Sequence, residues 1–167
     1  MRNPKVWALA LGLMCATAAH ANGVLEYAKS GGVKRCLPVI QKLSEYLIGA
    51  NKEAYGAHSV RGLVGADGKL FTAVIERNEP SYTSLASMSV APLPDGTCSA
   101  VYEQIYNASV SCTQMALLLP IYKLRTTLNK EVAVYEHQSD DTQTVYMMPT
   151  PNGCLLVKKG IWPSVAP

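Results

Sequence analysis

The stretch Pro94-Asp95-Gly96-Thr97-Cys98 decides how this chain is organised, because a shorter form of it, Pro151-Asn152-Gly153-Cys154, occurs again later in the sequence. Each copy lies between two segments that are typical of β-strands, which predicts two turns that each join a pair of strands. Cys36 precedes the first turn and Cys112 precedes the second. The sequence therefore predicts two tandem units, each with a cysteine, a helix, two strands, a turn, a second cysteine and a last strand.

The first unit, about residues 36–106, begins with the clearest helical pattern of the chain. Pro38 suits the first turn of this helix and Gly49 suits its end. The expected buried face, at helical spacing, consists of Cys36, Ile40, Leu43 and Leu47. The segment before this helix either frays or carries a short helix at 24–30. Strands are expected at 58–64, 69–77, 84–91 and 98–106, where β-branched, aromatic and alternating residues occur.

The second unit, about residues 112–162, follows a similar order with shorter elements. Residues 112–119 predict a short helix that Pro120 ends, because the proline ring removes a backbone hydrogen bond and clashes with the preceding turn. Strands are expected at 130–137, 143–148 and 154–161. The sequence thus predicts an α+β fold in a single domain, residues 22–167, with a mostly antiparallel sheet and two helices packed on one of its faces.

Residues 1–21 are expected to be a signal peptide. Two basic residues precede an apolar segment from Trp7 to Ala16, and Ala19-His20-Ala21 fits a cleavage site after Ala21. A transmembrane helix is disfavoured, since a membrane span needs roughly 20 apolar residues. Cys15 leaves a lipoprotein site as an alternative, although the residue before it is not a small one. The predicted location is therefore the periplasm or the exterior of the cell.

Four cysteines remain after the predicted cleavage, and an even number in an exported chain favours two disulfides. If each unit closes on itself, Cys36 pairs with Cys98 and Cys112 pairs with Cys154. The alternative, a bridge between Cys98 and Cys112, would link the junction of the units. In the chain-entropy model each bridge within a unit contributes on the order of 4 kcal/mol to stability. No metal is expected, because the thiols have no C-x-x-C pair and no histidine at ligand spacing.

The charge of the chain argues against two classes of partner. Without Arg2 and Lys5 the formal net charge falls from +3 to +1, and no cluster of lysine or arginine remains. Neither nucleic acid nor stable insertion into a membrane is therefore expected. The expected partner is a protein.

No motif in the sequence predicts an enzyme. A serine or cysteine nucleophile needs a histidine base, and only His58 and His137 follow the signal peptide, with no G-x-S-x-G motif in the chain. A site of His137 with Asp140 or Asp141, catalytic or metal-binding, is an alternative to an ordinary turn. The glutamates in and beside the strands single out no pair for glycosidase chemistry. Neither catalytic residues nor cofactors are predicted.

Tyrosine dominates the aromatic residues, with nine tyrosines against one phenylalanine and two tryptophans. A tyrosine has an apolar ring and a polar tip, which suits both half-buried sheet positions and interfaces. Tyr102 and Tyr106 are expected on one face of their strand, where they serve either ordinary sheet packing or a flat binding surface. The candidate partner-binding residues are Tyr82, Tyr102, Tyr106, Tyr135, His137, Asp140 and Asp141.

Export, two disulfides and the lack of catalytic motifs favour a non-enzymatic binding protein. The most concrete hypothesis is a periplasmic inhibitor or immunity protein that occludes a secreted or envelope-acting toxin enzyme, with a loop at 78–84 or 138–142 entering the cleft of that enzyme. The first alternative is an accessory protein of envelope assembly or secretion. The second is an enzyme of unrecognised type.

Overall fold

The computed structural model describes residues 23–49, 55–59, 67–79, 82–129 and 131–165. The predicted signal peptide and its cleavage site lie outside these residues. The elements follow one another as α1 (Gly23–Ser30), α2 (Leu37–Ile48), β1 (Tyr55–Ser59), β2 (Phe71–Glu79), β3 (Tyr82–Pro92), β4 (Cys98–Ala108), α3 (Cys112–Leu117), β5 (Tyr122–Leu128), β6 (Val132–His137), β7 (Gln143–Thr150) and β8 (Gly153–Val165).

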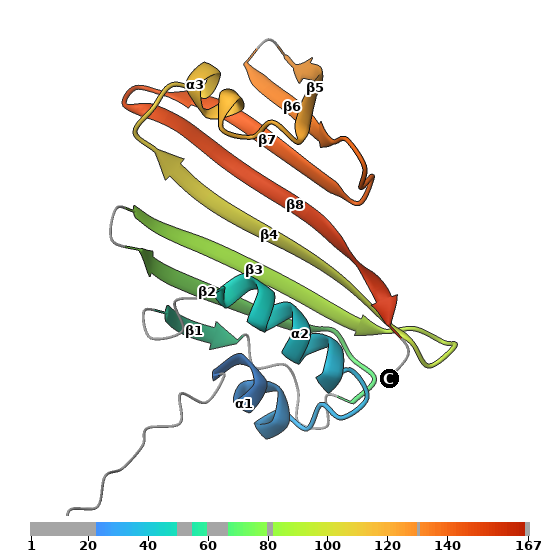
Figure 1. Ribbon diagram of the computed structural model, residues 1–167. Helices are drawn as coiled ribbons and strands as arrows, with labels where there is room; N and C mark the ends of the chain where they lie inside the picture. Colours follow the sequence, from blue (N-terminus) through green and yellow to red (C-terminus); the bar gives the residue numbers. More distant parts are fainter. Residues whose placement is uncertain (1–22, 50–54, 60–66, 80–81, 130, 166–167) are drawn as a thin grey trace, which may run out of the picture.

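The eight described strands form one antiparallel sheet in the order β1-β2-β3-β4-β8-β7-β6-β5 (Figure 1). Strands β1 to β4 are neighbours in chain order, and β5 to β8 repeat this arrangement, so each half of the chain forms a four-stranded meander. The two meanders join where β4 pairs with β8, from Cys98 opposite Val165 to Ala108 opposite Cys154. The predicted α+β class is confirmed.

Strand β5 is absent from the sequence-based expectation. Every residue of β5 except Tyr122 is exposed, so the strand lacks the alternation of buried and exposed positions by which strands are recognised. It lies at one edge of the sheet and pairs only with β6. The expected strand at 58–64 overlaps β1 at two positions, and residues 60–66 lie outside the described part of the chain.

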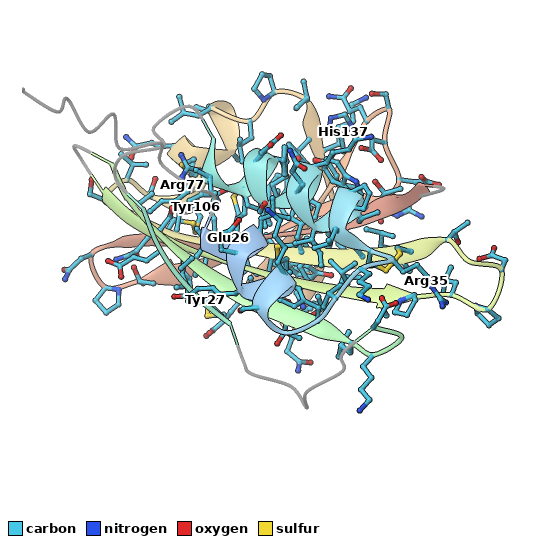
Figure 2. The ribbon with its side chains drawn as sticks, turned by 90° about the horizontal axis from the view of Figure 1, so that it is seen from below. Glu26, Tyr27, Arg35, Arg77, Tyr106 and His137 are labelled. Atoms are coloured by element: carbon cyan, nitrogen blue, oxygen red, sulfur yellow. A yellow bond between two sulfur atoms is a disulfide. The ribbon has the colours of Figure 1, made fainter. Side chains whose placement is uncertain are left out.

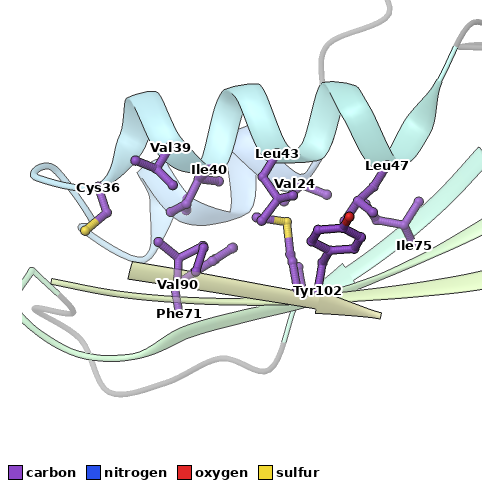
Figure 3. Packing of buried hydrophobic residues seen from close by; sticks show 14 of the residues in the cluster. Val24, Cys36, Val39, Ile40, Leu43, Leu47, Phe71, Ile75, Val90 and Tyr102 are labelled. Carbon is purple, nitrogen blue, oxygen red and sulfur yellow. The ribbon is translucent and has the colours of Figure 1, made fainter. Parts of the chain in front are cut away.

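The larger hydrophobic core lies between α2 and strands β2, β3 and β4 (Figure 3). The predicted apolar face of the helix is confirmed, since Ile40, Leu43 and Leu47 have no exposed surface. The sheet contributes residues at alternate positions of its strands, as expected when one face is covered: Phe71, Ala73, Ile75, Ala86, Met88, Val90, Ala100 and Tyr102. Helix α1 extends this core with Val24 and Ala28.

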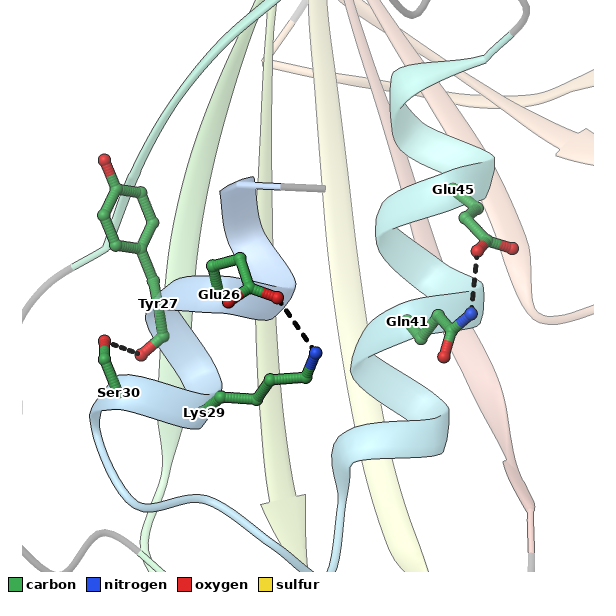
Figure 4. Close-up of polar contacts among 6 residues, drawn as sticks. All are labelled: Glu26, Tyr27, Lys29, Ser30, Gln41 and Glu45. Atoms are coloured by element: carbon green, nitrogen blue, oxygen red, sulfur yellow. Dashed lines mark hydrogen bonds and ion pairs between the residues drawn. The ribbon is translucent and has the colours of Figure 1, made fainter. Parts of the chain in front are cut away.

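The outer sides of α1 and α2 carry short-range polar contacts (Figure 4). Lys29 Nζ lies 2.9 Å from Glu26 Oε1, and Gln41 Nε2 donates to Glu45 Oε1 over 3.0 Å. Exposed pairs of this kind contribute little to stability, so the apolar faces decide how the helices pack. Helix α2 ends at Gly49, whose φ of +72° favours glycine. None of the described helices is long and apolar enough to span a membrane.

A smaller core lies between α3 and the second meander. Its buried residues are Tyr122, Val145, Met147, Cys154 and Leu156. Helix α3 begins with a capping box, in which the Ser111 hydroxyl accepts from Gln114 N–H and the Gln114 side chain accepts from Ser111 N–H. No residue of α3 is fully buried. The helix therefore covers this part of the sheet incompletely.

Two disulfides tie α2 and α3 to the central strands. Cys36–Cys98 joins the beginning of α2 to the beginning of β4, and Cys112–Cys154 joins α3 to the beginning of β8. These are the pairs expected if each unit closes on itself, and the alternative Cys98–Cys112 bridge is not formed. Cys98 and Ala108 lie on the same face of β4, and Ala108 is opposite Cys154. Both bridges, and hence both helices, therefore lie on one face of the sheet.

Candidate functional site

The sheet has one face that the helices cover and one face that no described element covers. Side chains alternate between the two faces along each strand. In β4 the buried Ala100 and Tyr102 accordingly alternate with Val101, which is 49% exposed. We call these sides the covered face and the open face; the three described helices lie on the covered face (Figure 1).

Apolar side chains gather on the open face. Strand register places Ile105 of β4 between Leu85 of β3 and Val157 of β8. Val101 lies opposite Ile161, which is 55% exposed. The open-face patch, as we define it, consists of Leu85, Val101, Ile105, Tyr146, Val157 and Ile161.

One ion pair divides the open-face patch. Lys159 Nζ lies 2.5 Å from Glu103 Oε1, and the two residues are directly opposite each other on β8 and β4. The hydrogen bond to Glu103 raises the pKa of Lys159, so its ammonium group is charged at neutral pH. The patch is therefore an apolar surface with one fixed pair of opposite charges near its centre.

The loop between β6 and β7, residues 138–142, is held by its own hydrogen bonds. Asp140 Oδ1 accepts from the Thr142 hydroxyl over 2.5 Å and from Thr142 N–H over 3.0 Å. Gln143 Nε2 donates to the other carboxylate oxygen of Asp140 over 2.5 Å. These bonds, led by that of the Thr142 hydroxyl, lower the pKa of Asp140. The carboxylate therefore stays ionised at neutral pH and keeps the loop closed on itself.

The same loop is anchored at one end and borders the open face at the other. Gln138 Nε2 donates to the carbonyl of Pro120 over 2.7 Å, and Gln138 N–H donates to the carbonyl of Ile121 over 2.9 Å. Asp141 is exposed and lines a hollow of about 530 Å³ on the open face, which Val101 and Tyr146 line as well. Of the two predicted aspartates, Asp141 thus lies next to the open-face patch.

His137 lies at the end of β6, directly before this loop (Figure 2). Its ring packs edge-on against Tyr122, with ring centroids 5.1 Å apart. Ser139 N–H donates to His137 Nδ1 over 3.2 Å, which makes Nδ1 an acceptor and leaves the ring proton of a neutral imidazole on Nε2. Within the ranges that the structure describes, no group of three or more histidine, cysteine, aspartate or glutamate residues could hold a metal ion.

The predicted tyrosines whose side chains the structure describes lie on the covered face rather than on the open one. Tyr102 is 3% exposed and packs in the larger core near Leu47 (Figure 3). Tyr106 and Tyr135 are half-buried against the smaller core. Tyr82 belongs to β3, but its side chain lies outside the described part of the structure. The open-face patch instead contains a different tyrosine, Tyr146.

Most residues of the open-face patch are aliphatic, and their types alone do not mark them in the sequence. The sequence signal is the alternation in residues 98–106, which puts Val101, Glu103 and Ile105 on one face of the strand and Tyr102 on the other. That pattern separates two faces. It does not tell which of them the helices cover.

A cavity of about 690 Å³ lies on the covered face, between α3 and the sheet. Its apolar lining comes from both elements: Met115, Leu118, Leu119, Tyr106, Val145 and Leu156. Arg77 of β2 and Lys158 of β8 line it too, and no described aspartate or glutamate does. Arg77 shares one row across the strands with Tyr106, as Figure 2 shows. The cavity is therefore mainly apolar, and Lys158 adds a positive charge to its lining.

Lys158 extends from this cavity towards α2. Its Nζ donates to Tyr46 Oη over 2.9 Å. Burial lowers the pKa of Lys158, but the hydrogen bond to Tyr46 and the other contacts outweigh it, so the pKa is raised overall. Burial, with the Tyr46 hydroxyl 3.4 Å away, raises the pKa of Tyr102. Lys158 is thus a charged ammonium group that is hydrogen-bonded to a tyrosine hydroxyl.

Comparisons with protein-family models, with curated proteins and with solved structures each give no match. The geometry of the two faces is therefore the basis on which a function can be assigned.

Proposed function

We propose that this protein is an exported, non-enzymatic binding protein that blocks a secreted or envelope-acting toxin enzyme, as an inhibitor or immunity protein does. Its contact surface is the open-face patch, and the loop at 138–142 covers or enters the cleft of the enzyme. This mechanism is occlusion. It requires area and shape complementarity and no reactive group.

The observation that carries the proposal is the uncovered apolar surface of the open face. The wet face of an antiparallel sheet is usually polar, whereas Val101 and Ile161 lie opposite each other here with about half of their surface exposed. Apolar patches rimmed by polar residues mark sites of protein association. The Glu103–Lys159 pair within the patch offers a partner a fixed pattern of charge, which favours one orientation of binding.

The loop at 138–142 supports occlusion because it is rigid before binding. Asp140 accepts hydrogen bonds from Thr142 and Gln143, and Gln138 is bonded to the segment before β5. A loop that is already ordered loses less conformational entropy when it binds. Asp141 remains exposed beside the patch and is available to a partner.

The two disulfides support an extracytosolic location, since such bridges persist mainly in oxidising compartments. Together with the signal peptide expected at residues 1–21, they favour the periplasm or the exterior of the cell. The bridges also tie α2 and α3 to β4 and β8, the strands at the centre of the open face. That surface therefore keeps its shape in the absence of a partner.

The proposal is tested by capture of a partner from envelope extract with the tagged, oxidised protein, followed by an activity assay of the captured enzyme. A standard interface buries about 800 Å² on each partner. Val101→Arg places a charge in the middle of that area and is expected to reduce capture by roughly tenfold or more. The matched control is Leu70→Arg, since Leu70 is exposed but lies before β2, outside the patch.

Mixing protein and enzyme at equal concentration is expected to abolish the activity of the enzyme. The proposal fails if no stoichiometric partner is recovered, or if Val101→Arg captures as much of it as the unmodified protein does. If the protein is instead an accessory protein of envelope assembly or secretion, the same open-face patch would bind a different partner. A captured assembly or export component, in place of an enzyme, would favour that alternative.

A further inference from the structure

We infer that the cavity on the covered face binds a single-chain anionic amphiphile, with the alkyl chain among the apolar residues beneath α3 and the carboxylate or phosphate group at Lys158. This site lies on the other side of the sheet from the open-face patch. The inference goes beyond the proposed function and does not rest on it.

The size and lining of the cavity suit an alkyl chain. Its volume of about 690 Å³ lies within the usual range for small-molecule sites, about 300–1,000 Å³. Leu118 lines the cavity and is still 66% exposed, and Ile121 beside it is also exposed. Helix α3 has no fully buried residue, and its Met115 lines the cavity together with Leu119 after the helix. A bound chain would cover these side chains.

The charge of the cavity determines which head group fits. Lys158 is half-buried, and its hydrogen bond goes to the hydroxyl of Tyr46 rather than to a carboxylate. No carboxylate among the described residues forms an ion pair with it. A partly buried ammonium group attracts an anion more strongly than an exposed one does, because water and salt screen its charge less. An anionic head group would supply the missing charge.

Both parts of the ligand are needed to explain the site. An uncharged lipid would fill the apolar part and leave Lys158 without a counter-ion. A small anion such as phosphate would meet the charge but leave Met115, Leu118 and Ile121 in contact with water. A cationic amphiphile would be repelled by Lys158. Only a molecule with an apolar chain and an anionic end matches the whole lining.

The inference is tested by isothermal titration calorimetry on the full, oxidised protein with ligands that share one chain and differ in their head group. Dodecanoate and dodecyl phosphate, below their critical micelle concentrations, represent fatty-acid and phosphate-ester head groups. Dodecyltrimethylammonium and inorganic phosphate are the controls for chain and charge. Saturable binding of either anionic ligand, at least tenfold tighter than that of both controls, is expected. Binding of only one of the two anions supports the inference and identifies the head group.

Two pairs of variants locate the site. Lys158→Met is expected to weaken dodecanoate binding at least tenfold without weakening binding of the cationic ligand. The control Lys159→Met should leave dodecanoate binding unchanged, because the side chain of Lys159 is on the open face. Leu118→Glu at the mouth is expected to weaken binding similarly. Its control is Leu117→Glu, since Leu117 is also exposed but does not line the cavity.

Leu117 and Leu118 are both exposed, so the glutamate variants are expected to fold, and thermal unfolding verifies this. The inference is overturned if neither anionic ligand binds saturably, if the cationic ligand binds as tightly as dodecanoate, or if Lys158→Met and Lys159→Met bind dodecanoate with equal affinity. Because Lys158 lies outside the open-face patch, these outcomes do not depend on whether a protein partner is captured.

Discussion

Replacement of Gly160 by alanine would test how closely the covered face is packed at its centre. Gly160 lies on β8 directly opposite Tyr102 of β4. A Cβ atom at position 160 would overlap the ring of Tyr102, closer than the 3.0 Å below which real Cβ contacts essentially never occur. Tyr102 is 3% exposed, and its ring lies 5.4 Å from that of Tyr46 on α2. The ring therefore cannot move aside without disturbing α2.

Two effects of opposite sign set the size of the change. A glycine inside a strand is less favourable than alanine by roughly 0.5–1 kcal/mol, because glycine loses more backbone entropy on folding. Overpacking of a filled core costs about 1–3 kcal/mol. The second effect is the larger one here, since the overlapping atoms belong to a buried ring. Gly160→Ala is therefore expected to lower the free energy of unfolding by about 1–2 kcal/mol.

Urea unfolding of the oxidised protein measures this change. Trp162, the only tryptophan after the predicted signal peptide, reports on the region, because its ring lies 5.4 Å from that of Tyr46. Tyr102→Leu removes the ring that causes the overlap. In that background Gly160→Ala is expected to be neutral or stabilising, and the double-mutant cycle isolates the coupling. Gly160→Ala with stability equal to or above that of the unmodified protein would refute the packing described here.

Three further predictions concern the bridges, the acidic turns and the glycines of the repeated turns. Cys112→Ser with Cys154→Ser should cost on the order of 4 kcal/mol in urea unfolding, and hydrogen exchange should show α3 opening first; unchanged stability would contradict this. Hydrogen bonds from the Arg35 and Lys34 N–H groups lower the pKa of Asp67. Hydrogen bonds from the Thr97 hydroxyl and N–H lower the pKa of Asp95, and the pKa of Asp140 is lowered in the same way. Their stabilisation is therefore present above the ordinary pKa of about 3.8 and is lost as pH falls through the lower folded values; replacing all three by asparagine should flatten the decline of melting temperature below pH 4. In Gly153→Ala the new Cβ would meet the Ala108 carbonyl, so this variant should lower the free energy of unfolding by at least about 2 kcal/mol. In Gly96→Ala the new Cβ meets no atom within 4 Å, so only backbone strain of about 1–2 kcal/mol is expected. Equal losses of stability in urea unfolding would contradict the close approach at Gly153.

The parts of the fold that local pattern determines could be predicted from the sequence. The spacing of Ile40, Leu43 and Leu47 is that of one helix face, and the helix buries that face. The repeated turns indicated which cysteines pair. Strand β5 could not be predicted, since residues 123–128 are all exposed and its pairing with β6 gives the sequence no apolar alternation.

The candidate sites depend on contacts that no local pattern contains. Alternation along β4 separates Tyr102 from Val101, but the tertiary packing of α2 decides that Tyr102 is buried. Likewise the cavity needs Arg77, Tyr106 and Lys158 on one face of β2, β4 and β8. Residues 77 and 158 line the same cavity because β8 pairs with β4, which joins the two meanders. Long-range pairing of this kind leaves no periodic signal in the sequence.

Strand β8 contributes to both proposed surfaces, and its period of two keeps them separate. Lys158 and Gly160 face the helices, while Val157, Lys159 and Ile161 belong to the open face. Neighbouring positions on one rigid strand therefore belong to different sites. The central position of β8, paired with β4 on one side and β7 on the other, means that a shift of register by one residue would exchange the two sets of side chains. The Cys112–Cys154 bridge at the beginning of β8 opposes such a shift. This disulfide therefore helps to keep each set of side chains on its own face of the sheet.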